Sequence, residues 1–103
     1  MKDYTGRLQD AIQRLHGCKS AHVATIPLTE QFNGRILWQG EVEIFHLHDH
    51  ANAKVCYAWA EEDDGGAEHY TAVLELPPVD SPRSAVRAAL TPVGQGTLKP
   101  PAE

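Results

Sequence analysis

The sequence predicts an α+β domain in which a four-stranded antiparallel meander lies between an N-terminal and a C-terminal helix, in the order α-β-β-β-β-α. Two observations support this prediction. Hydrophobic residues recur at helical spacing near both ends, and between residues 20 and 77 they alternate at the two-residue period of strands. Short turns between successive strands favour antiparallel pairing. We expect two layers, with both helices on one face of the sheet.

The first helix has an apolar side that faces the core, formed by Tyr4, Leu8, Ile12 and Leu15. Polar residues separate these positions, so the segment is amphipathic. Gly17 follows as a C-terminal glycine cap, because glycine readily adopts the left-handed conformation that ends a helix.

Four strands are expected over residues 21–32, 36–47, 53–62 and 68–76, which are rich in Val, Ile, Thr, Tyr and Trp. Turn signals separate them at Asn33-Gly34, at residues 48–52 and at residues 63–66. A second helix begins with Ser81 as N-cap and Pro82 at the first helical position, and it ends before Pro92. Residues 1–92 therefore form one domain, and residues 93–103 a mobile or extended tail.

Cross-strand matching of apolar residues defines two faces of the sheet. It sets Ile26 opposite Val42, and it requires a three-residue loop or a bulge near Gly34. A two-residue Asp64-Gly65 turn would set Trp59 opposite Tyr70. Face A then carries the apolar row that receives the helices, namely Ala24, Ile26, Val42, Ile44, Val55, Tyr57, Trp59, Tyr70, Ala72 and Leu74, with His22 opposite His46 at its end.

Face B carries a second apolar band, formed by Val23, Phe45, Leu47, Cys56 and Val73. A sheet face open to water is normally polar, so a contiguous apolar band there indicates a contact surface. We expect this band to be the interface of a homo-oligomer, most simply a dimer. A charge at Phe45 would dissociate such an assembly, whereas it would unfold the domain if Phe45 belonged to the core.

The stretch IFHLHDH, residues 44–50, contains three histidines and an aspartate. His46 and His48 share a face, and the expected register adds His22, so three imidazoles could bind Zn²⁺ or Ni²⁺. The histidines of a solvated or hydrogen-bonded strand end are the simpler interpretation, because the sequence offers no clear fourth ligand. A metal-dependent enzyme or metal-binding protein is therefore the alternative function.

The aromatic residues Trp38, Tyr57, Trp59 and Tyr70 could line a pocket for a flat or cationic ligand, or form the core beneath the helices. The acidic run at residues 61–66 lacks the alternating ligands of a calcium loop, and it suits a solvated hairpin tip. No nucleophile motif is evident, and nothing in the sequence implies a cofactor.

Composition limits the partners. Fourteen acidic and nine basic residues give a net charge of −5, which disfavours nucleic acids and anionic membranes. No stretch approaches the ~18 apolar residues of a membrane helix. The acidic N-terminal segment is unlike a secretory signal, so we expect a cytoplasmic protein with reduced thiols.

Three stretches, WQGEVEIFHL (38–47), YAW (57–59) and LPPVDSP (76–82), resemble a group of short bacterial α+β proteins of unknown function, similar to those of mobile gene cassettes. The likeness extends over about two thirds of the chain. It implies no activity and no catalytic residue. We therefore expect a non-enzymatic domain that self-associates and binds a protein partner or a small ligand.

Overall fold

The computed structural model describes residues 3–90 and 97–98. Its elements follow the predicted order, with one short strand added after the second helix. Their bounds are α1 Tyr4–His16, β1 Lys19–Phe32, β2 Arg35–His48, β3 Val55–Glu62, β4 Glu68–Leu74, α2 Pro82–Leu90 and β5 Thr97–Leu98. The α+β fold in the order α-β-β-β-β-α is confirmed.

The two helix caps predicted from the sequence are confirmed. Gly17 adopts φ 73° after α1, and its N–H donates to the carbonyl of Gln13 at 2.8 Å. The Ser81 hydroxyl accepts a hydrogen bond from the N–H of Ser84 at 3.1 Å, so it caps the first turn of α2. These caps satisfy backbone groups that a helix end would otherwise leave unpaired.

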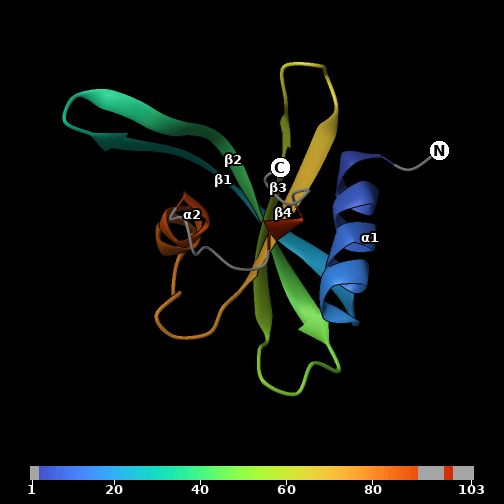
Figure 1. The fold of residues 1–103 in the computed structure, drawn as a ribbon. Coiled ribbons are helices and arrows are strands. Elements are labelled where there is room, and N and C mark those ends of the chain that lie inside the picture. Colours follow the sequence, from blue (N-terminus) through green and yellow to red (C-terminus); the bar gives the residue numbers. More distant parts are fainter. Residues whose placement is uncertain (1–2, 91–96, 99–103) are drawn as a thin grey trace.

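The sheet has the strand order β1-β2-β3-β4-β5, and all neighbours are antiparallel. The strand pairing between the β1–β2 and β3–β4 hairpins is short, with four pairs between residues 43–46 of β2 and residues 55–58 of β3. Past this junction the two hairpins diverge, as Figure 1 shows. The sheet is therefore split at one end, where β2 and β3 are no longer paired.

The two helices lie on opposite faces of the sheet, so the prediction that both pack on one face is wrong (Figure 1). Leu8 and Ile12 of α1 pack on face B, whereas Val86 of α2 packs on face A. The physical reason is that both faces are apolar. Either face left open would expose large side chains to water, and each short helix has only one apolar side.

The β3–β4 register differs by one residue from the predicted one. Trp59 pairs with Thr71 instead of Tyr70, because the loop is longer than a two-residue turn. Asp63 explains the longer loop, since its Oδ1 accepts hydrogen bonds from the N–H groups of Gly65 and Ala67, both at 2.9 Å. A shift of one residue moves every β4 side chain to the other face.

The β1–β2 pairing confirms the predicted match of Ile26 with Val42. A register shift between Glu30 and Gln31 supplies the bulge expected near Gly34. A second shift, between His22 and Ala24, was not predicted, and it sets His22 opposite Phe45 instead of His46. In β1, the strand at the outer edge of the sheet, Pro27 follows this second bulge.

The predicted interface on face B is largely the interior of this chain. Phe45, Leu47 and Cys56 are buried in the cluster that α1 covers. Val73 lies on face A, in the cluster covered by α2, because of the β3–β4 register. Val23 alone of the five is exposed, at 58%. An apolar face B left open for self-association is therefore contradicted. The oligomeric state itself stays a prediction.

The predicted tail falls mainly outside the described residues. Its residues 97 and 98 form β5, which pairs with Tyr70 and Thr71 of β4, so the sheet has five strands instead of four. In the described part of the chain, no helix is both long enough and apolar enough to cross a membrane. The cytoplasmic location stays a prediction.

The burial of Phe45 gives a direct test of its role in the core. We expect Phe45→Ala to lower the free energy of unfolding by about 3–5 kcal/mol, because it removes a fully buried ring from under α1. Val23→Ala is the matched control and should change it by less than about 0.5 kcal/mol, because Val23 is exposed. Urea unfolding measures both, and equal small effects would contradict this assignment.

Candidate ligand-binding site

The predicted metal-binding histidines do not come together. The bulge turns His22 to face B, where its Nε2 donates to Glu43 Oε1 at 2.7 Å and its ring packs against Phe45. His46 and His48 stay exposed on the opposite side of β2. No group of three His, Cys, Asp or Glu side chains within residues 3–90 is arranged to hold a metal ion. The proposed His22, His46 and His48 site is therefore contradicted by the geometry.

His50 has a structural role in the turn after β2. Its Nδ1 accepts hydrogen bonds from the backbone N–H groups of Asn52 and Ala53, at 3.1 and 3.0 Å. The side chain thereby satisfies two donors of an irregular segment. The simpler interpretation of the histidine-rich stretch, hydrogen-bonded or solvated strand-end residues, agrees with this geometry.

The four aromatic residues that could line a pocket separate into three environments. Trp38 of β2 and Trp59 of β3 make an edge-to-face contact between the two hairpins, with ring centroids 5.4 Å apart and planes at 65°. Tyr57 is buried beneath α2, and its hydroxyl donates to Glu75. Tyr70 lies on face B because of the β3–β4 register, and its hydroxyl donates to Glu68. Only the two tryptophans remain together.

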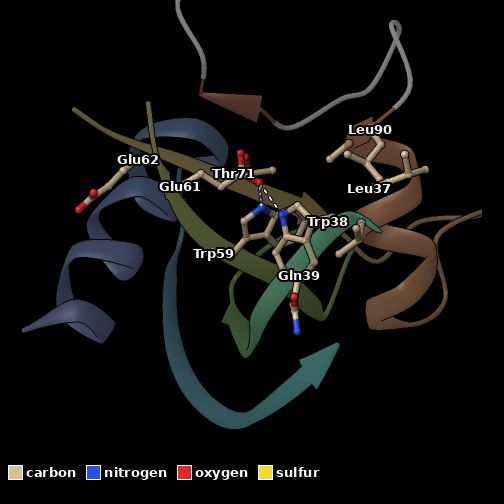
Figure 2. A pocket seen from close by; sticks show the side chains of 10 residues that line it. Leu37, Trp38, Gln39, Trp59, Glu61, Glu62, Thr71 and Leu90 are labelled. Carbon is tan, nitrogen blue, oxygen red and sulfur yellow. Dashed lines mark hydrogen bonds between the residues drawn. The ribbon is translucent and has the colours of Figure 1, made fainter. Parts of the chain in front are cut away.

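A cavity of about 330 Å³ lies between the diverging hairpins and the C-terminal end of α2. Its lining includes both tryptophans, and Figure 2 shows their indoles side by side with the Glu61 side chain above them. The lining residues are Leu37, Trp38, Gln39, Trp59, Glu61, Glu62, Thr71, Val86, Ala89 and Leu90.

Glu61 accepts a hydrogen bond from each indole. Its Oε2 lies 2.6 Å from Trp38 Nε1 and 3.1 Å from Trp59 Nε1. Trp38 and Trp59 are 9% and 2% exposed, so this carboxylate is the partner that their buried N–H groups require. The second oxygen, Oε1, accepts no hydrogen bond from the described residues, which leaves it for a ligand.

The sequence prediction missed Glu61 because it begins an acidic run that suits a solvated hairpin tip. One signal could have identified it. Residues two apart in a strand share a face, so Glu61 lies on the same face as Trp59. Because a buried indole N–H needs an acceptor, a carboxylate two positions away is a natural partner for it.

A second cavity, of about 360 Å³, lies beside the first and shares Leu37 and Leu90 with it. Its other lining residues are Glu30, Gln31, Phe32 and Arg87. Phe32, Leu37 and Leu90 are 64%, 53% and 42% exposed, so the floor of this groove is an open apolar surface. Exposed large side chains gathered in one place are typical of a contact site.

Two arginines of α2 hold a buried carboxylate beneath this groove. Arg83 Nη1 and Arg87 Nε contact the two oxygens of Glu30 at 2.7 and 2.6 Å. The hydrogen bond from Arg87 is the main cause that holds the pKa of Glu30 below its ordinary value of 4.5, and Arg83 adds to it. Two cations against one carboxylate leave a local surplus of positive charge.

The two cysteines are unsuited to thiolate chemistry near neutral pH. Cys18 and Cys56 are both buried and free. Burial raises the pKa of the Cys56 thiol from 9.0 to about 12, and that of Cys18 is also raised, mainly by burial. A nucleophilic cysteine needs the opposite shift, so the interpretation of Cys56 as a small buried hydrophobic residue is supported.

Comparisons with known proteins found no matching family, no similar curated protein and no similar solved structure. The resemblance to short bacterial proteins of unknown function therefore stays a prediction.

We expect Glu61→Ala to lower the free energy of unfolding by about 2–4 kcal/mol, because it leaves two buried indole N–H groups without an acceptor. Glu61→Gln should cost less than about 1 kcal/mol, since its amide oxygen can accept both hydrogen bonds. Chemical unfolding followed by circular dichroism measures the difference. Equal losses in the two variants would show that the indoles do not depend on this acceptor.

Cys56 predicts a loss of stability in alkali. The folded chain keeps the thiol proton at a pH where the unfolded chain has lost it. The protonated thiol therefore makes its full contribution to the free energy of unfolding below pH 9.0. About 4 kcal/mol of this free energy is lost as pH rises from 9.0 towards 12. Urea unfolding between pH 7 and 10.5 should show the wild-type advantage over Cys56→Ala shrinking above pH 9. Val42→Ala removes no titrating group. Its free energy of unfolding should therefore differ from that of the wild type by the same amount across this pH range.

Proposed function

We propose that this protein is a non-enzymatic binding module whose cavity between the two hairpins takes a cationic group, either an ammonium or a guanidinium. The group belongs to a small ligand or to a lysine or arginine side chain of a partner protein. The observation that carries this proposal is the Glu61 carboxylate, held by two indole N–H groups at the wall of the cavity with one oxygen left over.

The chemistry of the lining supports a cation. An ionised carboxylate forms its strongest hydrogen bonds with charged donors, and these are strengthened where water is partly excluded. Indole rings attract cations through their negative faces, and tryptophan is the most effective aromatic residue in this respect. Glu62 adds a second negative charge at the cavity. An anion would meet the Glu61 carboxylate here, so the lining discriminates against it.

The size of the cavity and the net charge of the chain agree with the binding of a small cation. A volume of about 330 Å³ lies at the lower end of the range for small-ligand sites. Such a cavity accommodates a short cationic chain better than a nucleotide or a large cofactor. The net charge of −5 favours the approach of cations from solution.

Intrinsic fluorescence tests this function directly, because the only two tryptophans of the chain, Trp38 and Trp59, both line the cavity. N-butylguanidinium and butylammonium should each give a saturable change in emission at millimolar concentration, the range expected of so few atoms. Butylurea has a similar shape without the charge, and it should give no saturable change.

The variants Glu61→Gln and Glu62→Gln separate local recognition from overall charge, since each removes one negative charge. Glu61→Gln should weaken the binding of the better cation about tenfold, because a charged hydrogen-bond acceptor is lost. Glu62→Gln should have a smaller effect, because its side chain points away from the indoles (Figure 2). Equal binding of butylurea, or equal effects of both variants, would refute the cation site.

A further inference from the structure

We infer that the cation cavity and the apolar groove beside it form one continuous docking surface for an extended peptide segment of a partner protein, with a basic residue, apolar residues and an acidic residue in sequence. This inference rests on the proposed function, because the basic residue of the segment is the group that enters the cavity. It adds the class of partner.

The two cavities are continuous through shared residues. Leu37, from the β1–β2 hairpin, and Leu90, at the end of α2, line both of them. Figure 2 shows these two side chains next to each other, beside the indoles. From there the surface extends over Phe32, which lines only the second cavity. A ligand confined to the first cavity would leave this exposed apolar surface uncovered.

The charges at the two ends are opposite. Glu61 and Glu62 lie at the cavity between the hairpins. Arg87 lies at the other end, where its side chain is 63% exposed and only its Nε contacts Glu30. Its terminal nitrogens are donors well shaped for a carboxylate. The matching occupant therefore carries a cation at one end, an apolar middle and an anion at the other end.

A peptide meets this description better than a small ion, because successive residues of an extended chain supply three different chemistries in a row. Each cavity, of about 330 and 360 Å³, is large enough to take side chains of a peptide. A segment docked along them buries Phe32, Leu37 and Leu90, and the burial of such exposed apolar surface favours association. The charges at the ends fix the direction of the segment.

The test uses two fluorescently labelled peptides, Arg-Leu-Leu-Glu and Glu-Leu-Leu-Arg, both with blocked ends, and measures their binding by fluorescence anisotropy. One of the two orders should bind at least about tenfold tighter than N-butylguanidinium, because it adds apolar contacts to the cation. Replacing its glutamate by glutamine should weaken binding to the wild-type protein and have no effect on binding to the Arg87→Gln variant.

Phe32→Ser and Ile36→Ser form a matched pair on the same hairpin. Both residues are exposed, at 64% and 56%, but Ile36 lines neither cavity. Phe32→Ser should weaken peptide binding about tenfold and leave the binding of N-butylguanidinium unchanged, whereas Ile36→Ser should leave both unchanged.

Each alternative outcome is distinct. If N-butylguanidinium binds and neither peptide binds more tightly, the peptide surface is refuted and the proposed cation site stands. If neither cation nor peptide binds, both proposals fail. If sedimentation shows a wild-type dimer that Phe32→Ser dissociates, the groove holds a second copy of this chain, and the peptide inference is overturned.

Discussion

A sheet that is apolar on both sides is the constraint on which this structure depends. Phe45 and Cys56 must be kept from water on one face, and Val42 and Trp59 on the other. With few residues outside the sheet, the chain has one helix for each face. Each helix has a single apolar side, so it can bury only one face of the sheet. The separation of α1 from α2 follows from hydrophobic burial and not from a preference of the connections.

The split of the sheet then creates the candidate site. Because β2 and β3 stay paired only as far as Glu43 and Ala58, the strands beyond have no common ladder to close the gap. Trp38 and Trp59 face this gap, and their N–H groups find an acceptor in Glu61 instead of a neighbouring strand. The same hydrogen bonds that stabilise the tryptophans also fix the orientation of the carboxylate. In the proposed function, stability and recognition would therefore share one set of contacts.

The sequence predicted the elements well because their signals are long and periodic. The structure contains both predicted helices, with their glycine and serine caps. It also has the predicted pairing of the first three strands around Ile26 and Ile44. The errors come from single residues. The Asp63 loop and the bulge at Val23 each add one residue, and each moves side chains to the other face. Such shifts separate the predicted metal-binding histidines and move Val73 to face A. The role of Glu61 was missed because it begins an acidic run.

The outer edge of the sheet has a consequence for how the protein behaves in a crowded solution. β1 is a long strand with one side open, and such edges can recruit further strands into fibrous aggregates. The bulge at Val23 interrupts the regular spacing of its backbone groups, and Pro27 contributes no N–H donor. An incoming strand would find only short stretches with which to pair. The bulge that separates His22 from the other two histidines therefore also disfavours aggregation by addition of strands to this edge.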